Sequence, residues 1–215
     1  QGFVDGFREP RLDVLIANAG LYNPRYRESD GGFEHTVGVS HLGHFLLVRG
    51  LLPRLLTGGG GRVVMVSSES HRLPKRLDFE RLPQRAGRYS SVVAYGQAKL
   101  CNVLFANELQ RRYGDRGLTA CSLHPGNMVT TDLGRNSLFV RAVLALVSPF
   151  TKSPQQGAAT SVWCAVHPEP NAIAGRYFSH CRPLEVSPEA ADPAVARRLW
   201  ELTESWCPGE TRPGS

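Results

Sequence analysis

A tyrosine and a lysine four residues apart are the side chains in this sequence with the spacing best suited to proton transfer. Tyr95 and Lys99 lie within residues 90–113, where apolar spacing and the lack of helix breakers predict a helix. Positions i and i+4 share a helix face, so the phenol and the ammonium are expected one turn apart. A nearby cation lowers the tyrosine pKa from its ordinary value of about 10. Such a phenol can exchange a proton with an alcohol or carbonyl oxygen.

The same spacing also arises from a packing tyrosine and a solvated lysine, so the residues that follow the predicted strands decide the interpretation. Three apolar runs, residues 13–17, 62–66 and 118–123, are followed by Asn18-Ala19-Gly20, Ser67-Ser68 and Pro125-Gly126. Ligands of open α/β sheets bind outside the carboxyl ends of the strands, so these residues are expected to border one pocket. There Ser68 can bond a substrate oxygen, Tyr95 can exchange its proton, and Lys99 can hold the phenolate and a ribose hydroxyl. Gly20 and Gly126 would let the backbone approach a flat cofactor closely.

The order of the predicted elements indicates an α/β domain with a Rossmann-like parallel sheet and helices on both faces. Helices are predicted at residues 1–9, 31–56, 90–113, 153–167 and 193–206, with a fourth strand at 175–178. This alternation is typical of βαβ crossovers. We expect one domain over residues 1–207 and a disordered tail at 208–215, which is rich in proline and glycine. Four glycines at 58–61 precede a strand, so they predict a helix end and no phosphate-binding loop.

The composition is that of an ordinary soluble domain and argues against several functional classes. Of the 215 residues, 41% are hydrophobic and 20% are charged. The net charge of +6 comes from scattered arginines without interleaved aromatics, so we expect no nucleic-acid partner. No apolar run reaches the roughly 20 residues of a membrane span, and the most apolar stretch, 138–150, is interrupted by Arg141. His41 and His44 have no third ligand beside them, so no metal site is expected.

The cysteines bear on the compartment of the protein. The five cysteines are odd in number and show no Cys-x-x-Cys spacing. Reduced, partly buried thiols in an intracellular compartment explain this pattern, because disulfides form in oxidising compartments. We therefore expect a cytoplasmic protein.

The ordered set of Asn-Ala-Gly, Ser-Ser, Tyr-x-x-x-Lys and Pro-Gly resembles the short-chain dehydrogenases/reductases over residues 13–206. The resemblance implies a nicotinamide cofactor, NAD or NADP, and hydride transfer to or from an apolar carbonyl or alcohol such as a steroid or retinoid. It makes Tyr95 the acid/base, Lys99 the ligand of the nicotinamide ribose and Ser68 the residue that binds and orients substrate. It also implies cofactor contacts at Asn18, Ala19, Gly20, Tyr95, Lys99, Pro125, Gly126, Val129 and Thr131.

Four phrases, at residues 67–72, 124–128, 149–153 and 155–160, resemble one branch of that family more closely. In that branch the domain accompanies modules that bind proline-rich peptides, and the retinol dehydrogenases are the alternative relatives. The resemblance extends the expected partners from a small apolar carbonyl or alcohol to other proteins and to a homodimer through the Tyr95 helix. It also extends the expected locations to the mitochondrion and the nucleus.

Two departures from the family pattern leave a second function open. Ser40 stands where the family has an asparagine that helps a water-linked proton relay, and its shorter side chain is expected to weaken or reroute that relay. The family's first strand and the Gly-rich turn that holds the pyrophosphate are not found. We therefore expect the C-terminal part of a longer protein, lacking the N-terminal βαβ nucleotide-binding portion and inactive alone. A catalytically impaired regulatory protein, acting in signalling or apoptosis, is the alternative to an oxidoreductase.

Overall fold

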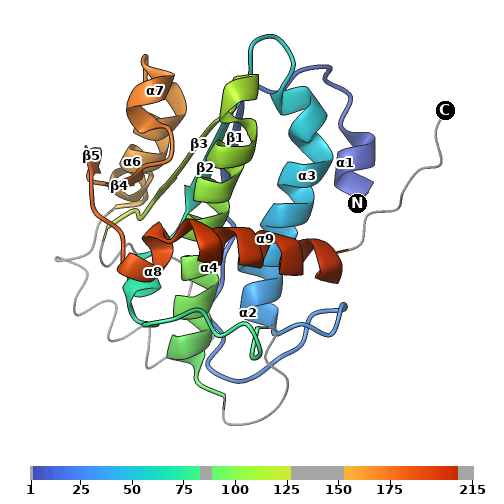
Figure 1. The fold of residues 1–215 in the computed structure, drawn as a ribbon, viewed down its shortest axis with the longest axis vertical. Helices are drawn as coiled ribbons and strands as arrows, with labels where there is room; N and C mark the ends of the chain where they lie inside the picture. The colour runs from blue at the N-terminus through green and yellow to red at the C-terminus, as the bar shows by residue number, and fades with distance from the viewer. Residues whose placement is uncertain (1, 83–88, 127–152, 208–215) are drawn as a thin grey trace.

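Four parallel strands form the centre of the molecule in a computed structural model that describes residues 2–82, 89–126 and 153–207 (Figure 1). The sheet runs in the order β1 (Val14–Ala17), β2 (Arg62–Val66), β3 (Thr119–Leu123), β4 (Tyr177–Ser179) and β5 (Arg182–Pro183). β5 pairs antiparallel with β4, and it is a strand that the sequence did not predict. In register, Val64 of β2 lies opposite Ile16 on one side and Cys121 on the other. The carboxyl ends of the four parallel strands therefore meet at one edge.

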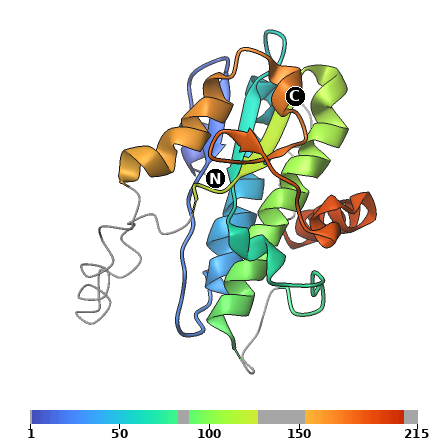
Figure 2. The ribbon, with the colours of Figure 1, turned by 90° about the vertical axis from the view of Figure 1, so that its left-hand side faces the viewer.

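Helices cover both faces of this sheet, as predicted (Figure 2). The main ones are α3 (Gly43–Leu55) and α4 (Ser91–Tyr113) on one face, and α6 (Pro154–Val166) on the other. Side chains of β2 alternate between the two cores: Val63 and Met65 pack with α3 and α4, whereas Val64 and Val66 pack with Cys164 of α6. This alternation follows the period of two residues along a strand. A strand buried on both faces is apolar throughout, which is why its sequence predicted it well.

The helix expected at residues 31–56 begins later and is interrupted. It consists of α2 (His35–Val37), a π-helical turn (Gly38–Leu42) and α3. The buried carboxylate of Glu34 caps the start, because its two oxygens accept the backbone N–H groups of Thr36 and Val37 at 2.9 Å. The glycine run ends the helix as predicted, with positive φ angles at Gly58, Gly59 and Gly60.

The C-terminal helix α9 (Pro193–Trp206) lies across α4 and α3 (Figure 1). Trp200 carries this contact: its ring lies 5.5 Å from that of Phe105 in α4 and 5.2 Å from that of Phe45 in α3. The shorter helices are α1 (Gly2–Gly6), α7 (Pro170–Ile173) and α8 (Pro188–Ala191), with 3-10 turns at Glu69–Arg72 and Gly114–Arg116. Within the described ranges, no helix is long and apolar enough to cross a membrane.

Candidate active site

Three hydrogen bonds join the end of β2 to the middle of α4. Ser67 Oγ donates to the carbonyl of Lys99 at 2.6 Å. In the reverse direction, Lys99 Nζ and Asn102 Nδ2 each donate to the carbonyl of Val66 at 3.1 Å. Lys99 and Asn102 are three residues apart on one helix face. Asn102 was not predicted from the sequence, although its position three residues after Lys99 on the same helix face could have indicated it.

Ser68 and Tyr95 meet at this junction. Ser68 is the N-cap of the 3-10 turn Glu69–Arg72, where its Oγ accepts the N–H of Ser70 at 3.2 Å. The side chain of Ser68 is also close enough to the Tyr95 phenol to act on its pKa. The Tyr95 ring is half-buried and lies edge-on to Tyr22, with ring centroids 5.9 Å apart. Tyr22 is in turn held by a 2.6 Å bond between its hydroxyl and Ser91 Oγ. No sequence pattern indicated Tyr22, because it lies in a loop.

The expected lowering of the Tyr95 pKa is wrong for this structure. Burial raises the pKa of Tyr95, and the side chain of Ser68 acts in the opposite direction. The ammonium of Lys99 lies 5.6 Å from the centre of the Tyr95 ring and donates to the Val66 carbonyl. Burial also lowers the pKa of Lys99 itself, to about 8, which weakens its hold on a proton. The helix therefore places Tyr95 and Lys99 one turn apart, but this proximity does not make the phenol of Tyr95 more acidic.

Gly20 lies close to both the Lys99 ammonium and the Ser40 hydroxyl. A Cβ atom built on Gly20 would stand 3.0 Å from Lys99 Nζ and 3.5 Å from Ser40 Oγ. Ser40 is fully buried in the π-helical turn, and its hydroxyl has no hydrogen-bond partner among the described residues. A π-helical turn inside a helix is frequent at functional sites, and an unpaired buried hydroxyl is costly. Asn18 and Ala19 precede Gly20 at the end of β1.

The loop after β3 carries two of the residues that are predicted to contact the cofactor. Pro125 and Gly126 follow the strand, and Gly126 has a φ angle of 96°, which favours glycine. Its N–H donates to Nδ1 of His124 at 3.1 Å. Val129 and Thr131 lie outside the described residues, as do the apolar stretch 138–150 and the tail 208–215.

Two buried histidines stand behind the site on the π-helical turn and α3. Burial lowers the pKa of His41 to about 3 and that of His44 to about 4, and the charge of Lys99 adds to the effect on His44. His41 Nε2 hydrogen-bonds with Thr203 Oγ1 of α9 at 2.9 Å. Among residues 2–82, 89–126 and 153–207, no group of three or more potential metal-binding side chains gathers at one point.

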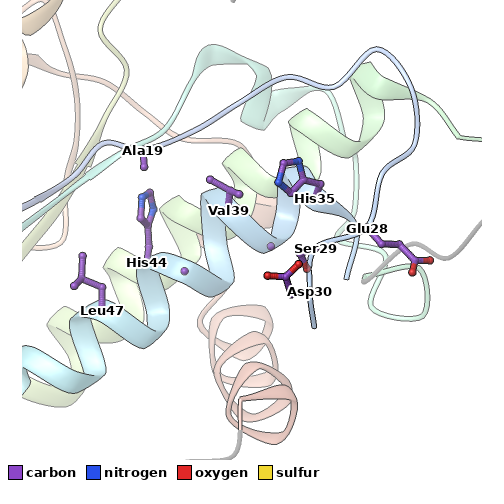
Figure 3. A pocket seen from close by; sticks show the side chains of 10 residues that line it. Ala19, Glu28, Ser29, Asp30, His35, Val39, His44 and Leu47 are labelled. Carbon is purple, nitrogen blue, oxygen red and sulfur yellow. The ribbon is translucent and has the colours of Figure 1, made fainter. Parts of the chain in front are cut away.

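A pocket of about 510 Å³ runs along the α2–α3 helix beside the site (Figure 3). Ala19 lies over His44 at one end, and Glu28 and Asp30 lie at the other. Ser68, Tyr95 and Lys99 are not among the described residues that line it. The pocket reaches the Asn18–Gly20 loop through Ala19, and the carboxylates of Glu28 and Asp30 at its other end would repel an anion there.

Comparisons with known proteins agree with this geometry. A family model described as "short chain dehydrogenase" matches residues 4–77. A WW domain-containing oxidoreductase from Danio rerio is 46% identical over 199 residues, or 90% of this chain and 48% of that protein. Human Retinol dehydrogenase 14 is 42% identical over 200 residues, which cover 91% of this chain and 59% of that protein. The chain spans about half the length of the WW domain-containing relatives that it matches.

Solved structures show the same fold. The crystal structure of an uncharacterized protein from Mycobacterium Paratuberculosis has a TM-score of 0.75 and 35% identity, and covers 95% of this chain and 69% of that chain. The WW domain-containing oxidoreductases are the branch that the phrases at residues 67–72 and 124–128 indicated, so this prediction is confirmed. By its sheet, its strand ends and its relatives, the chain belongs to the short-chain dehydrogenase/reductase family.

Proposed function

We propose that this chain carries the proton-transfer half of an NAD(P)-dependent oxidoreductase site that acts on an apolar carbonyl or alcohol. The observation that carries the proposal is the convergence of Ser68, Tyr95 and Lys99 where β2 ends against α4. Proton exchange at a carbonyl oxygen requires hydroxyl groups and a nearby cation. The hydroxyls of Ser68 and Tyr95 and the buried ammonium of Lys99 provide them at the carboxyl edge of the parallel sheet.

Each of the three residues has a separate role in the proposed site. Tyr95 donates its proton to the carbonyl oxygen during reduction, or accepts the proton of the alcohol during oxidation. Ser68, whose side chain lies near the Tyr95 phenol, binds the same oxygen of the substrate and orients it. The cationic form of Lys99 stabilises the negative charge that develops on the Tyr95 oxygen once its proton has left.

The residues around Lys99 fit a nicotinamide nucleotide. Two polar groups lie together here, the Lys99 ammonium and the unpaired Ser40 hydroxyl, and the backbone of Gly20 lies close to both. These groups could hydrogen-bond with the two hydroxyls of a ribose. Asn18, Ala19, Pro125 and Gly126 would border the rest of the nucleotide, and Val129 and Thr131 remain proposed contacts. When bound, the nucleotide supplies or accepts the hydride. Either NAD or NADP is compatible with these residues.

An apolar substrate is supported by a groove beside the first turn of α4. The groove, of about 470 Å³, is lined by the apolar Leu73, Pro74, Leu77, Val92 and Val93 together with the polar Lys75, Arg76, Asp78 and Gln97. Three of these side chains are about half exposed although they are apolar. The names of relatives such as Retinol dehydrogenase 14 agree with a steroid- or retinoid-like substrate.

We also propose that the protein is located in the cytoplasm. The cysteines at positions 101, 121, 164, 181 and 207 are free thiols, and four of them are buried. Such thiols suit a reducing compartment. A homodimer through the Tyr95 helix is also proposed; within one chain, α9 packs against this helix.

The test compares Tyr95→Phe with Tyr113→Phe, a matched change at the far end of the same helix, with both changes made in a chain that also contains an N-terminal nucleotide-binding portion. Fluorescence titration with NADPH and with NADH measures cofactor affinity, and absorbance at the nicotinamide band measures turnover of retinal and of a steroid ketone. We expect Tyr95→Phe to abolish turnover and to leave cofactor affinity within about twofold, because only the transferable proton is lost. Tyr113→Phe should retain both properties. Full turnover by Tyr95→Phe would disprove the assigned role.

A regulatory binding function is the second candidate. It is favoured by the raised pKa of Tyr95 and by Ser40, which offers the proton relay a single hydroxyl. In this case, capture of protein partners should survive both Tyr95→Phe and Lys99→Met. Loss of capture in either variant would argue for a function that depends on the catalytic residues.

A further inference from the structure

Two phrases that set this sequence apart within its family meet in space. Glu69, in the turn after β2, and His124, at the end of β3, approach to 3.3 Å between carboxylate Oε2 and imidazole Nε2. Glu69 is next to Ser68, and His124 begins the Pro125-Gly126 loop. The pair therefore joins the substrate-side strand end to the nicotinamide-side strand end across the edge of the sheet.

The hydrogen bond from Gly126 sets the tautomer of His124. The Gly126 N–H donates to Nδ1 at 3.1 Å, so Nδ1 must be the unprotonated nitrogen. In the neutral ring the proton then sits on Nε2, which lies 3.3 Å from Glu69 Oε2, so the carboxylate acts on it through charge and not through a hydrogen bond. The side chain of His124 is 8% exposed, so water competes little for either nitrogen. A carboxylate that orients a histidine through its second nitrogen is a recurrent way to hold an imidazole in place.

The surrounding side chains hold both partners. The His124 ring stacks on Tyr177 of β4, with centroids 5.8 Å apart and planes at 28°. Glu69 Oε1 pairs with Arg72 Nε at 2.7 Å, which keeps the carboxylate in the turn. The ring of His71 also contacts Tyr177, with centroids 4.8 Å apart, and its Nδ1 hydrogen-bonds with the carbonyl of Ser68 at 2.8 Å. The imidazole of His124 is therefore held by contacts from the turn after β2 and from the start of β4.

We propose that His124 is a positioning residue that pins the Gly126 turn for the nicotinamide end of the cofactor, with Glu69 as the residue that keeps its tautomer. Gly126 adopts a left-handed conformation, with a φ angle of 96°, and donates its N–H to His124. The effect on cofactor and turnover rests on the proposed function. The hydrogen bond and the tautomer do not, so they can be tested without any cofactor.

Three variants separate the parts of the arrangement. His124→Ala removes both contacts. His124→Asn keeps an acceptor that can reach the N–H two residues on, as asparagine does in turns, but it cannot reach Glu69. Glu69→Gln removes the charge, and Glu80→Gln is its matched control at an exposed glutamate in the same segment.

Nuclear magnetic resonance of the 215-residue chain gives the first measurement. In the unchanged chain we expect the Nε2–H tautomer of His124 and a Gly126 amide protected from hydrogen exchange. His124→Ala should speed that exchange by about tenfold, as loss of one hydrogen bond allows. His124→Asn should restore most of the protection, and Glu69→Gln should increase the Nδ1–H population of His124. A Gly126 amide that exchanges equally in the unchanged chain and in His124→Ala would overturn the proposal, as would the Nδ1–H tautomer in the unchanged chain.

Titration with NADPH and NADH gives the second measurement. His124→Ala should weaken binding by about tenfold, with His124→Asn closer to the unchanged chain. Glu69→Gln should weaken it by about twofold, because the carboxylate is 45% exposed and solvent screens its charge. Equal affinity in all variants that bind would refute the positioning role. A chain that binds neither nucleotide would count against the proposed function alone, since the exchange and tautomer results still decide the structural inference.

Discussion

The ammonium of Lys99 lies 3.0 Å from the point where a Cβ atom on Gly20 would stand, and this relationship ties the end of β1 to α4. Ser40 Oγ lies 3.5 Å from the same point. Three segments far apart in the sequence thus leave room for one hydrogen atom at position 20. A methyl group at position 20 would therefore press against the Lys99 ammonium.

Gly20→Ala should therefore displace the Lys99 ammonium. We expect affinity for NADPH and NADH to fall by about tenfold, in line with the loss of one charge-assisted hydrogen bond. Fluorescence titration measures this loss, and the pKa of Lys99, which burial lowers to about 8, gives a readout that needs no nucleotide. Gly6→Ala is the control, because a Cβ there meets nothing within 4 Å. An unchanged Lys99 pKa and unchanged affinity would show that position 20 tolerates a methyl group.

Ser40→Ala should raise stability while it lowers activity. The Ser40 hydroxyl is fully buried and has no hydrogen-bond partner among the described residues, so its removal should add about 1 kcal/mol to the free energy of unfolding. Ser67→Ala is the contrasting variant, because Ser67 Oγ donates to the Lys99 carbonyl at 2.6 Å and its loss should cost about 1 kcal/mol. Urea unfolding measures the free energy of unfolding of both variants. A destabilised Ser40→Ala would mean that the hydroxyl is paired.

Mild acid should destabilise the chain through His41 and His44. Their pKa values in the folded chain, about 3 and about 4, lie below the ordinary 6.5. Between pH 6.5 and pH 4 the unfolded chain therefore binds protons that the folded chain does not, and stability falls as pH falls. Each histidine should contribute a loss of about 2 kcal/mol at pH 5.

Urea unfolding at pH 7 and pH 5 measures this dependence. The double variant His41→Gln, His44→Gln should flatten the stability profile between these pH values, whereas His167→Gln, at the half-exposed end of α6, should leave the slope as it is. The same slope in the double variant and in the unchanged chain would assign the acid sensitivity to other groups.

Tyr22 should affect turnover through its contact with Tyr95. Tyr22→Phe keeps the edge-on ring contact and loses the 2.6 Å bond to Ser91, so turnover should fall by about twofold. Tyr22→Ala loses both and should reduce kcat by about tenfold, because the Tyr95 ring is left free to shift. Tyr26→Phe, on the same loop, removes an exposed bond to Glu28 and is the control. Steady-state kinetics measure all three, and full activity in Tyr22→Ala would exclude the contact as a positioning element.

Long elements with a continuous local signal were predictable from the sequence. The strand at residues 62–66 and the helix at 193–206 have the predicted bounds, because a doubly buried strand is apolar throughout and Pro193 follows the capping Asp192. β5, with two residues, is too short to show a period. The π-helical turn at Ser40 could not be predicted either, because it lies between two α-helical segments and its sequence has the same helical pattern as theirs.

The sequence by itself determined which chemical groups stand at the strand ends and in what order, because those groups follow directly from the chain. Only the tertiary structure decided which of them meet: Glu69 with His124, and Gly20 with Lys99. It also reversed the expected shift of the Tyr95 pKa. A pKa depends on the desolvation and charge contributed by every segment packed around the group. Burial of this kind depends on residues far apart in the chain, and no local pattern encodes it.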